Sequence, residues 1–137
     1  MLRKRGEQNF TLTPGGVSSL ETRLALVHTF GVRAGHLTLH RWVEACCTFP
    51  ADLHGLTQKG RLTPGYEADI VLFDPDREIT YSAGILHSNL SYTQYQGLTV
   101  TGAPVTTISR GEVIVENGQY IGRRGRGKFV KRKYESA

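Results

Sequence analysis

Three aspartates lie within the stretch GYEADIVLFDPDREITY, which covers residues 65–81. Asp69, Asp74 and Asp76 could form a cluster of carboxylates, which are groups suited to general acid–base catalysis. A structural interpretation competes with this one, because Asp74 and Asp76 flank Pro75 and such a step ordinarily forms a turn where a strand ends. Asp69 can likewise accept a hydrogen bond from a neighbouring turn. We therefore expect turn-forming aspartates here and assign no catalytic residue.

Five histidines could supply metal ligands. Only His36 and His40 are four residues apart, the spacing that brings two side chains onto one face of a helix. His36, however, precedes the expected start of that helix, and no carboxylate or cysteine joins the pair at a fitting spacing. We therefore expect surface histidines and assign no metal ligand to this chain. The other three are expected to be structural or exposed: His28, His54 and His87.

The two cysteines, Cys46 and Cys47, are adjacent in the chain. A thiol could act as a nucleophile, but a cysteine on the apolar face of a helix ordinarily packs as a small hydrophobic residue. Adjacent cysteines also cannot easily form a disulfide with each other. Two unpaired thiols favour a reducing, cytoplasmic location over an oxidising one.

The basic residues are concentrated in a C-terminal tail. Residues 123–133 contain no acid and seven basic side chains: Arg123, Arg124, Arg126, Lys128, Lys131, Arg132 and Lys133. The net charge of +5 belongs to this segment, because the remainder of the chain is close to neutral. Such a tail can be solvated, or it can contact nucleic-acid phosphates with an affinity that falls steeply with salt. No aromatic platform or nucleic-acid motif accompanies it, so the sequence does not favour a nucleic-acid partner.

Two amphipathic helices are expected before residue 56. The segment SSLETRLALVHTFG opens with a capping box formed by Ser18 and Glu21, and Gly31 is placed to end it in a left-handed turn. The segment LTLHRWVEACC repeats apolar residues at helical spacing and has Thr38 as its expected N-cap. A further helical turn should follow, with Pro50 at its first position.

From Asp69 onward the chain favours β-strands, in the runs DIVLF, EITY, LTVTG, VTTIS, EVIVE and QYI. Arg110-Gly111 and Asn117-Gly118 separate such runs and indicate hairpins. Residues 83–96 have no clear period and are expected to cross between sheets. Helices followed by antiparallel strands are typical of the α+β class. Because the strands have faces of their own to cover, we expect the helices to need a packing partner outside this chain.

Length and composition restrict the possibilities further. At 137 residues the chain has room for one domain of ordinary size. A hydrophobic fraction of 39% and a charged fraction of 21% are typical of a globular protein and exclude a disordered one. No apolar stretch approaches the roughly 20 residues that cross a bilayer. The basic N-terminus is not followed by the apolar segment of a secretory signal, and we expect no membrane partner.

Four segments, in this order, resemble the C-terminal end of the cyclic amidohydrolases: GGVSSLETRL, FPADLHGL, KGRLTPGYEADIVLFDPD, and SRGEVIVENG with GRGKFVKR. The resemblance runs from about Phe10 to Arg132, which is nearly the whole chain. The third segment is similar to an element found across many amidohydrolases. The Glu-Thr-Arg-Leu of residues 21–24 and the Gly-x-Gly-x-Phe tail resemble the dihydropyrimidinase and D-hydantoinase branch rather than allantoinases or dihydroorotases.

The resemblance implies the closing helices of a (β/α)8 amidohydrolase barrel, followed by the C-terminal strands of a β-sandwich. Residues 1–57 would be the end of the barrel, residues 58–122 the sandwich strands and residues 123–137 the basic C-terminal tail. Enzymes of this family open a cyclic amide or imide, such as a hydantoin or a dihydropyrimidine, by hydrolysis. Two zinc ions polarise the carbonyl group and supply hydroxide near neutral pH.

The family's zinc ligands are four histidines, a carboxylated lysine and an aspartate, carried at the ends of barrel strands. None of them maps onto this sequence, so the resemblance implies no cofactor in this chain and two Zn²⁺ ions in the complete enzyme. In relatives, backbone groups of a Pro-Asn-Gly turn touch the substrate ring. The matching turn here is Pro14-Gly15-Gly16, where a backbone contact can survive the change of side chain.

We interpret the chain as the C-terminal fragment of a dihydropyrimidinase- or hydantoinase-like hydrolase that is inactive alone. The alternative is a non-catalytic structural or oligomerisation module that pairs with a full-length homologue. The expected partners are a homo-oligomer or the missing part of the barrel, and the tail would pack on a neighbouring subunit through Phe129 and Arg132. Without these partners, the helices should expose an apolar patch and the sheet should have open edges.

Overall fold

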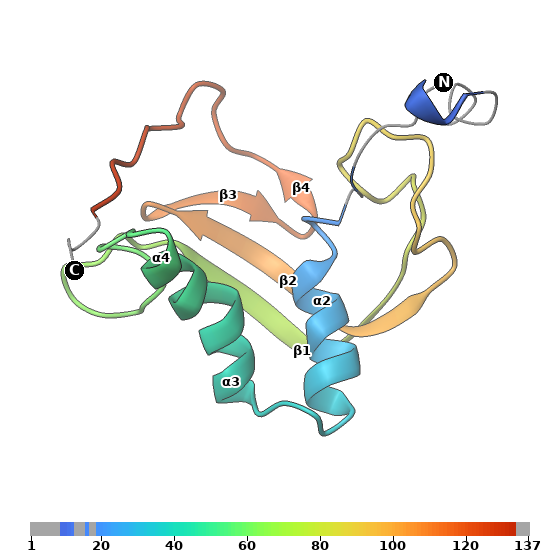
Figure 1. Ribbon diagram of the computed structural model, residues 1–137, viewed down its shortest axis with the longest axis horizontal. Coiled ribbons are helices and arrows are strands. Elements are labelled where there is room, and N and C mark those ends of the chain that lie inside the picture. Colours follow the sequence, from blue (N-terminus) through green and yellow to red (C-terminus); the bar gives the residue numbers. More distant parts are fainter. Residues whose placement is uncertain (1–8, 13–15, 17–18, 134–137) are drawn as a thin grey trace.

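Helices occupy the first part of the chain and β-strands the second. The computed structural model describes residues 9–12, 16 and 19–133. A 3-10 turn, η1 (Phe10–Leu12), is followed by two helical segments that stand on the same side of a four-stranded antiparallel sheet (Figure 1). This mixed arrangement of helices and antiparallel strands confirms the expected α+β class.

The first helical segment comprises α2 (Arg23–Val27) and the π-helical turns η2 (His28–Arg33), which follow without a break. Because helical geometry begins only at residue 23, Glu21 lies before the first turn and not inside it. Its carboxylate accepts hydrogen bonds from the backbone and the ring of His87. The capping box was therefore a wrong assignment for Glu21, and Ser18 lies outside the described residues.

The left-handed end of this segment is also one turn later than expected. Gly31 does not have a positive φ, whereas Gly35 does, at +77°. The backbone N–H groups of His36 and Leu37 both donate to the carbonyl of Gly31, which closes the helix end. Gly31 is needed for packing instead, because an added Cβ would lie 2.8 Å from Cδ1 of Leu37.

The second helical segment runs continuously through α3 (Leu39–Val43), η3 (Glu44–Thr48) and α4 (Phe49–Leu53). Thr38 is its N-cap, as the sequence predicts, and its hydroxyl accepts a hydrogen bond of 3.1 Å from the Arg41 N–H. Pro50 lies in the first turn of α4, which confirms its expected position. The two expected helical pieces are joined into one segment, in which the π-helical turns of η3 directly precede Phe49 and Pro50.

The sheet contains four strands: β1 (Ile70–Thr80), β2 (Thr99–Ser109), β3 (Glu112–Glu116) and β4 (Gln119–Tyr120). They pair antiparallel in the order β1-β2-β3-β4. Both expected hairpins are confirmed. All four turn residues have positive φ, from +49° to +78°, as a type I′ turn requires: Arg110, Gly111, Asn117 and Gly118.

The expected strand end at Asp74-Pro75-Asp76 is wrong, because β1 continues through it to Thr80. The pairing register shifts between Asp74 and Glu78, so these residues form an irregularity inside the strand. Asp74 Oδ1 accepts a hydrogen bond of 3.0 Å from the Asp76 N–H, which confirms the local turn-forming role. The side chains of Asp74 and Asp76 are exposed, whereas Asp69 pairs with Lys59.

Residues 83–96 do not cross between sheets, because they connect β1 and β2, which are neighbours in one sheet. Hydrogen bonds join the two ends of this connection. The Tyr81 N–H donates to the Leu98 carbonyl at 2.9 Å, and the Gly97 N–H donates to the Tyr81 carbonyl at 2.8 Å. The connection therefore returns beside the strand that it leaves.

The helices were expected to pack only against a partner outside this chain. One face of each helical segment instead packs against the sheet of the same chain. Ala25 of α2 packs in a buried cluster with Tyr81 and Val100, which lie at the end of β1 and in β2. A second cluster joins both helical segments to the sheet, since the ring of His28 lies 5.3 Å from Trp42 and 4.9 Å from Phe73. His28 is only 3% exposed and its Nδ1–H donates to the Thr101 carbonyl at 2.8 Å, which confirms a structural role.

The outward faces of the helices remain apolar, as expected. Large exposed hydrophobic side chains on or beside them are Leu20, Phe30, Leu39, Val43, Phe49 and Leu53. Trp42, which lies on the same helix as Leu39 and Val43, is instead buried against the sheet at 8% exposure. None of the described helices has the length and apolarity needed to span a bilayer.

Candidate functional site

A groove of about 770 Å³ lies between the helices and strand β1. One wall is formed by the second helical segment, including Trp42, Val43 and the two cysteines. The other is formed by consecutive residues 69–73 at the start of β1. Because apolar side chains provide most of the lining, the groove is suited to packing and not to binding a charged group.

Strand β1 contributes an open edge to this region of the molecule. It is the first strand in the sheet order, and β2 pairs with only one of its edges. Among the described residues no strand covers the other edge. An open edge presents unpaired N–H and C=O groups that can bind a further strand.

The indole of Trp42, a residue of the groove wall, carries a buried polar group. Its Nε1–H is buried, and no acceptor in the described part of the chain lies within hydrogen-bonding distance. Buried donors are almost always paired in native proteins, because a lost hydrogen bond leaves the full desolvation cost. The groove therefore combines an apolar lining with an open strand edge, which are features of a contact surface.

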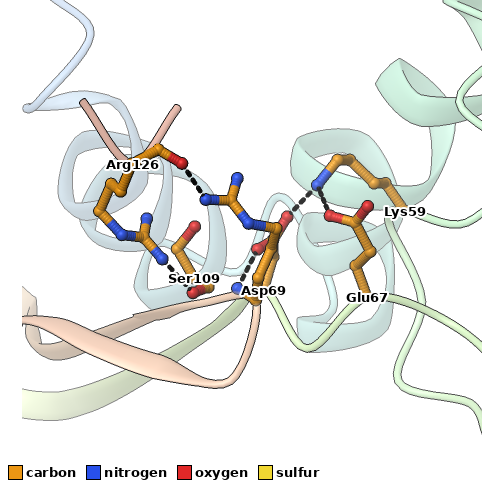
Figure 2. A network of polar contacts seen from close by, with 6 residues as sticks. Lys59, Glu67, Asp69, Ser109 and Arg126 are labelled. Carbon is orange, nitrogen blue, oxygen red and sulfur yellow. Dashed lines mark hydrogen bonds and ion pairs between the residues drawn. The ribbon is translucent and has the colours of Figure 1, made fainter. Parts of the chain in front are cut away.

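A network of ion pairs lies next to the groove and joins the end of the helices to the sheet (Figure 2). The Nζ of Lys59 contacts the carboxylates of both Glu67 and Asp69, with the Glu67 contact at 2.6 Å. Burial opposes the charged form of Lys59, but hydrogen bonds to these carboxylates outweigh it and raise its pKa. Burial also acts against ionised Asp69, yet hydrogen bonds from Lys59 and the Arg110 N–H lower its pKa.

Asp69 and its neighbours also fix the β2–β3 turn and the tail. Asp69 Oδ1 accepts a hydrogen bond of 2.8 Å from the Arg110 N–H, which confirms its expected contact with a turn. The Arg110 guanidinium donates to the Arg126 carbonyl, and the Arg126 guanidinium donates to the Ser109 carbonyl (Figure 2). Lys59 contacts both carboxylates of this network, so neither is the free base that acid–base catalysis needs.

His87 forms a separate bridge between three segments. Its Nδ1 lies 2.7 Å from the Glu21 carboxylate and its Nε2 lies 3.0 Å from the Gly118 carbonyl. Both neighbours are acceptors, so the ring makes both hydrogen bonds only as an imidazolium. The hydrogen bond to Glu21, aided by the charge of that carboxylate, raises the pKa of His87.

We expect the stability of the chain to reflect this bridge. Since the pKa of folded His87 is raised above its ordinary 6.5, the stabilisation is fully present below about pH 6.5 and is lost as pH rises through the folded pKa. Urea unfolding at a series of pH values should show this loss in the native chain and not in His87→Gln. His36→Gln removes an exposed histidine and is the control, which should keep the native pH profile. An unchanged profile in His87→Gln would contradict the bridge.

The other candidate residues from the sequence, the two cysteines and the Pro14-Gly15-Gly16 turn, do not form a common site among the described residues. Cys46 and Cys47 are free thiols in the groove wall, and partial desolvation raises the pKa of both, which disfavours the reactive thiolate. Cys47 is exposed and not buried as expected. Pro14 and Gly15 lie outside the described residues, and Gly16 is exposed with φ +82°.

Three residues of the ion-pair network were not identified from the sequence. Lys59, Glu67 and Arg126 are far apart along the chain or belong to loops, where side-chain partners are set by the tertiary structure. One signal was available, because the lysine and the two acids belong to a single segment, KGRLTPGYEAD. Among the described residues, no group of three or more His, Cys, Asp or Glu side chains is placed to hold a metal ion.

Comparisons with known proteins identify a family and several relatives of this chain. A model of the amidohydrolase family matches residues 9–114. The D-hydantoinase of Streptomyces coelicolor is 39% identical over 131 residues, which cover 95% of this chain and 28% of that protein. The D-phenylhydantoinase of Escherichia coli O1:K1 is 40% identical over 126 residues, covering 91% of this chain and 27% of that protein.

Solved structures agree with these sequence matches. The dihydropyrimidinase of Brevibacillus agri superposes with a TM-score of 0.93 at 36% identity, covering 99% of this chain and 30% of that one. The L-hydantoinase of Arthrobacter aurescens superposes with a TM-score of 0.86 at 38% identity, covering 96% and 29%. The chain thus spans less than a third of the length of these relatives.

Proposed function

Because this chain belongs to the amidohydrolase family, we propose that it is the C-terminal portion of a hydantoinase- or dihydropyrimidinase-type hydrolase of cyclic amides. Its matches within the family are D-hydantoinases and dihydropyrimidinases. In this role residues 1–57 contribute the end of a (β/α)8 barrel, residues 58–122 contribute β-sandwich strands and residues 123–137 form the tail. The chain supplies packing surface and closes the fold, and it does not supply the reacting groups.

The groove beside β1 is the observation that carries this proposal. Relatives contain more than twice as much additional chain as the matched segment. A strand from that additional part would pair with the open edge of β1 and cover the apolar groove beside it. The barrel would then cover the exposed apolar faces of the helices.

The hydrolytic chemistry belongs to the rest of such an enzyme. Breaking the C–N bond of a cyclic amide requires an activated water and a polarised carbonyl, which two zinc ions supply when bound. The described residues do not fit this metal pair, because no suitable ligand group occurs among them. What this chain could add near substrate is backbone from Pro14-Gly15-Gly16, at the loop that resembles the family's ring-contacting turn.

A second function is favoured by the exposure of the tail. Phe129 is 93% exposed, which is unusual for a phenylalanine and suits a subunit contact. The chain could therefore be a non-catalytic module that pairs with a full-length homologue through Phe129, Arg132 and the groove. Recovery of a full-length amidohydrolase with the tagged chain from its own cells would favour this module, and recovery of none would favour the first function. Free thiols at Cys46 and Cys47 suit the cytoplasm for either function.

A chimera tests the first function. The matched 131-residue segment of the Streptomyces coelicolor D-hydantoinase would be replaced by the corresponding residues of this chain. We expect the chimera to fold, retain metal and hydrolyse hydantoin, because the reacting groups lie in the unchanged part. A folded chimera that retains metal but has no turnover would contradict the proposal.

A further inference from the structure

The C-terminal tail is attached to the rest of the chain at two points. At one end, Arg126 contacts Glu112 and Ser109, and Arg110 donates to the Arg126 carbonyl. At the other end, the Lys133 N–H donates to the Gly55 carbonyl at 2.9 Å. The tail therefore runs from the hairpins back to the end of α4, as Figure 1 shows.

Between these attachments the tail borders a hollow of about 370 Å³. The opposite side is formed by the turn after α4 and by the β2–β3 turn. Its lining contains five basic residues and a single acid. The basic residues are Lys59, Arg110, Lys128, Lys131 and Lys133, and the acid is Glu67.

The single acid does not neutralise the tail lysines. Glu67 is paired with Lys59 at 2.6 Å. No ion pair joins Lys128, Lys131 or Lys133 to an acid within the described ranges. Like charges held around one hollow repel one another, and a bound anion relieves that repulsion.

We propose that this hollow binds a compact polyanion of the phosphate class. Its volume falls at the small end of the roughly 300–1,000 Å³ typical of ligand sites, which suits a di- or triphosphate group. Three tail lysines line it, and lysine is a common ligand for phosphate through charge-assisted hydrogen bonds. The hollow shares no lining residue with the groove beside β1, so this inference goes beyond the proposed function and does not depend on it.

Calorimetric titration of the full chain tests the proposal, with tripolyphosphate, ATP and a single-stranded oligonucleotide as separate probes. We expect tripolyphosphate to bind and the double variant Lys128→Gln/Lys131→Gln to lose about 100-fold in affinity, or about tenfold for each lysine. ATP binding more tightly than tripolyphosphate would identify a nucleotide as the source of the phosphates. Binding of the oligonucleotide alone would overturn the proposal in favour of nucleic acid.

A control variant that removes the same number of positive charges distinguishes a specific binding site from nonspecific electrostatic attraction. Arg77→Gln/Arg124→Gln removes two exposed cations that do not line the hollow. We expect this control to change the affinity by less than about threefold, because neither side chain lines the hollow and exposed charges are screened by salt. Equal losses in the two double variants, or no tripolyphosphate binding by the folded chain, would overturn the proposal. The circular dichroism spectrum of each variant should match that of the native chain.

Discussion

Replacing Gly102 with alanine is expected to lower the free energy of unfolding by about 3 kcal/mol or more. Gly102 lies in β2 with φ +102°, a conformation that side chains rarely adopt. An added Cβ would overlap the His28 ring, with Cε1 at 2.7 Å, and would lie 2.8 Å from Cε1 of Phe73. Both rings are held in the aromatic cluster that joins the helices to the sheet, so neither can move away freely. Urea unfolding of the 137-residue chain measures the change.

Gly111→Ala is the matched control for this substitution. Gly111 also has a positive φ, +77°, but no atom would lie within 4 Å of an added Cβ. Its cost should be about 1 kcal/mol, from backbone strain alone. Because native domains have only about 5–15 kcal/mol of stability in total, Gly102→Ala should strongly populate unfolded chain. If both substitutions lowered the free energy of unfolding equally, β2 would not pack against His28 as described.

In the chimera with the Streptomyces coelicolor enzyme, Val71→Asp is expected to reduce the amount of folded, active enzyme at least tenfold. Val71 lines the groove and is 41% exposed in this chain. If a further strand and the barrel cover the groove, the substitution places an unpaired carboxylate in an apolar interface. Burial of an unpaired charge costs several kcal/mol, and even 1.4 kcal/mol changes an equilibrium tenfold. Soluble yield and hydantoin turnover are the measurements.

Ile85→Asp provides the comparison. Ile85 is a β-branched residue of similar exposure, 49%, and it lies in the connection between β1 and β2, outside the groove. We expect this chimera to keep most of its activity. In the isolated chain, Val71→Asp should have little effect on stability, because the side chain is already in contact with water. If Val71→Asp and Ile85→Asp behave alike in the chimera, the groove is not the contact surface.

Local chemistry predicted much of the fold. The Thr38 cap and the Asn117-Gly118 hairpin depend on residues a few positions apart, so the sequence is sufficient to identify them. Gly31 was misassigned because a glycine that ends a helix and a glycine that admits Leu37 look alike in sequence. The continuity of β1 through Pro75 was missed because the pairing with β2 is only interrupted at the local turn and resumes at Glu78.

The candidate site was less predictable. Asp69 was correctly expected to bind a turn, but its pairing with Lys59 depends on where α4 ends relative to the sheet. The burial of Trp42 likewise depends on contacts with His28 and Phe73, which are about 14 and 31 residues away in sequence. Helical periodicity assigns a residue to a face, and it does not say which partner that face will meet.

The measurement that tests the central claim most directly is the zinc content and ring-opening activity of the purified, dialysed 137-residue chain. The proposed function predicts that the chain holds no stoichiometric zinc and hydrolyses neither hydantoin nor dihydrouracil. Two tightly held zinc ions per chain together with turnover of either substrate would contradict the account.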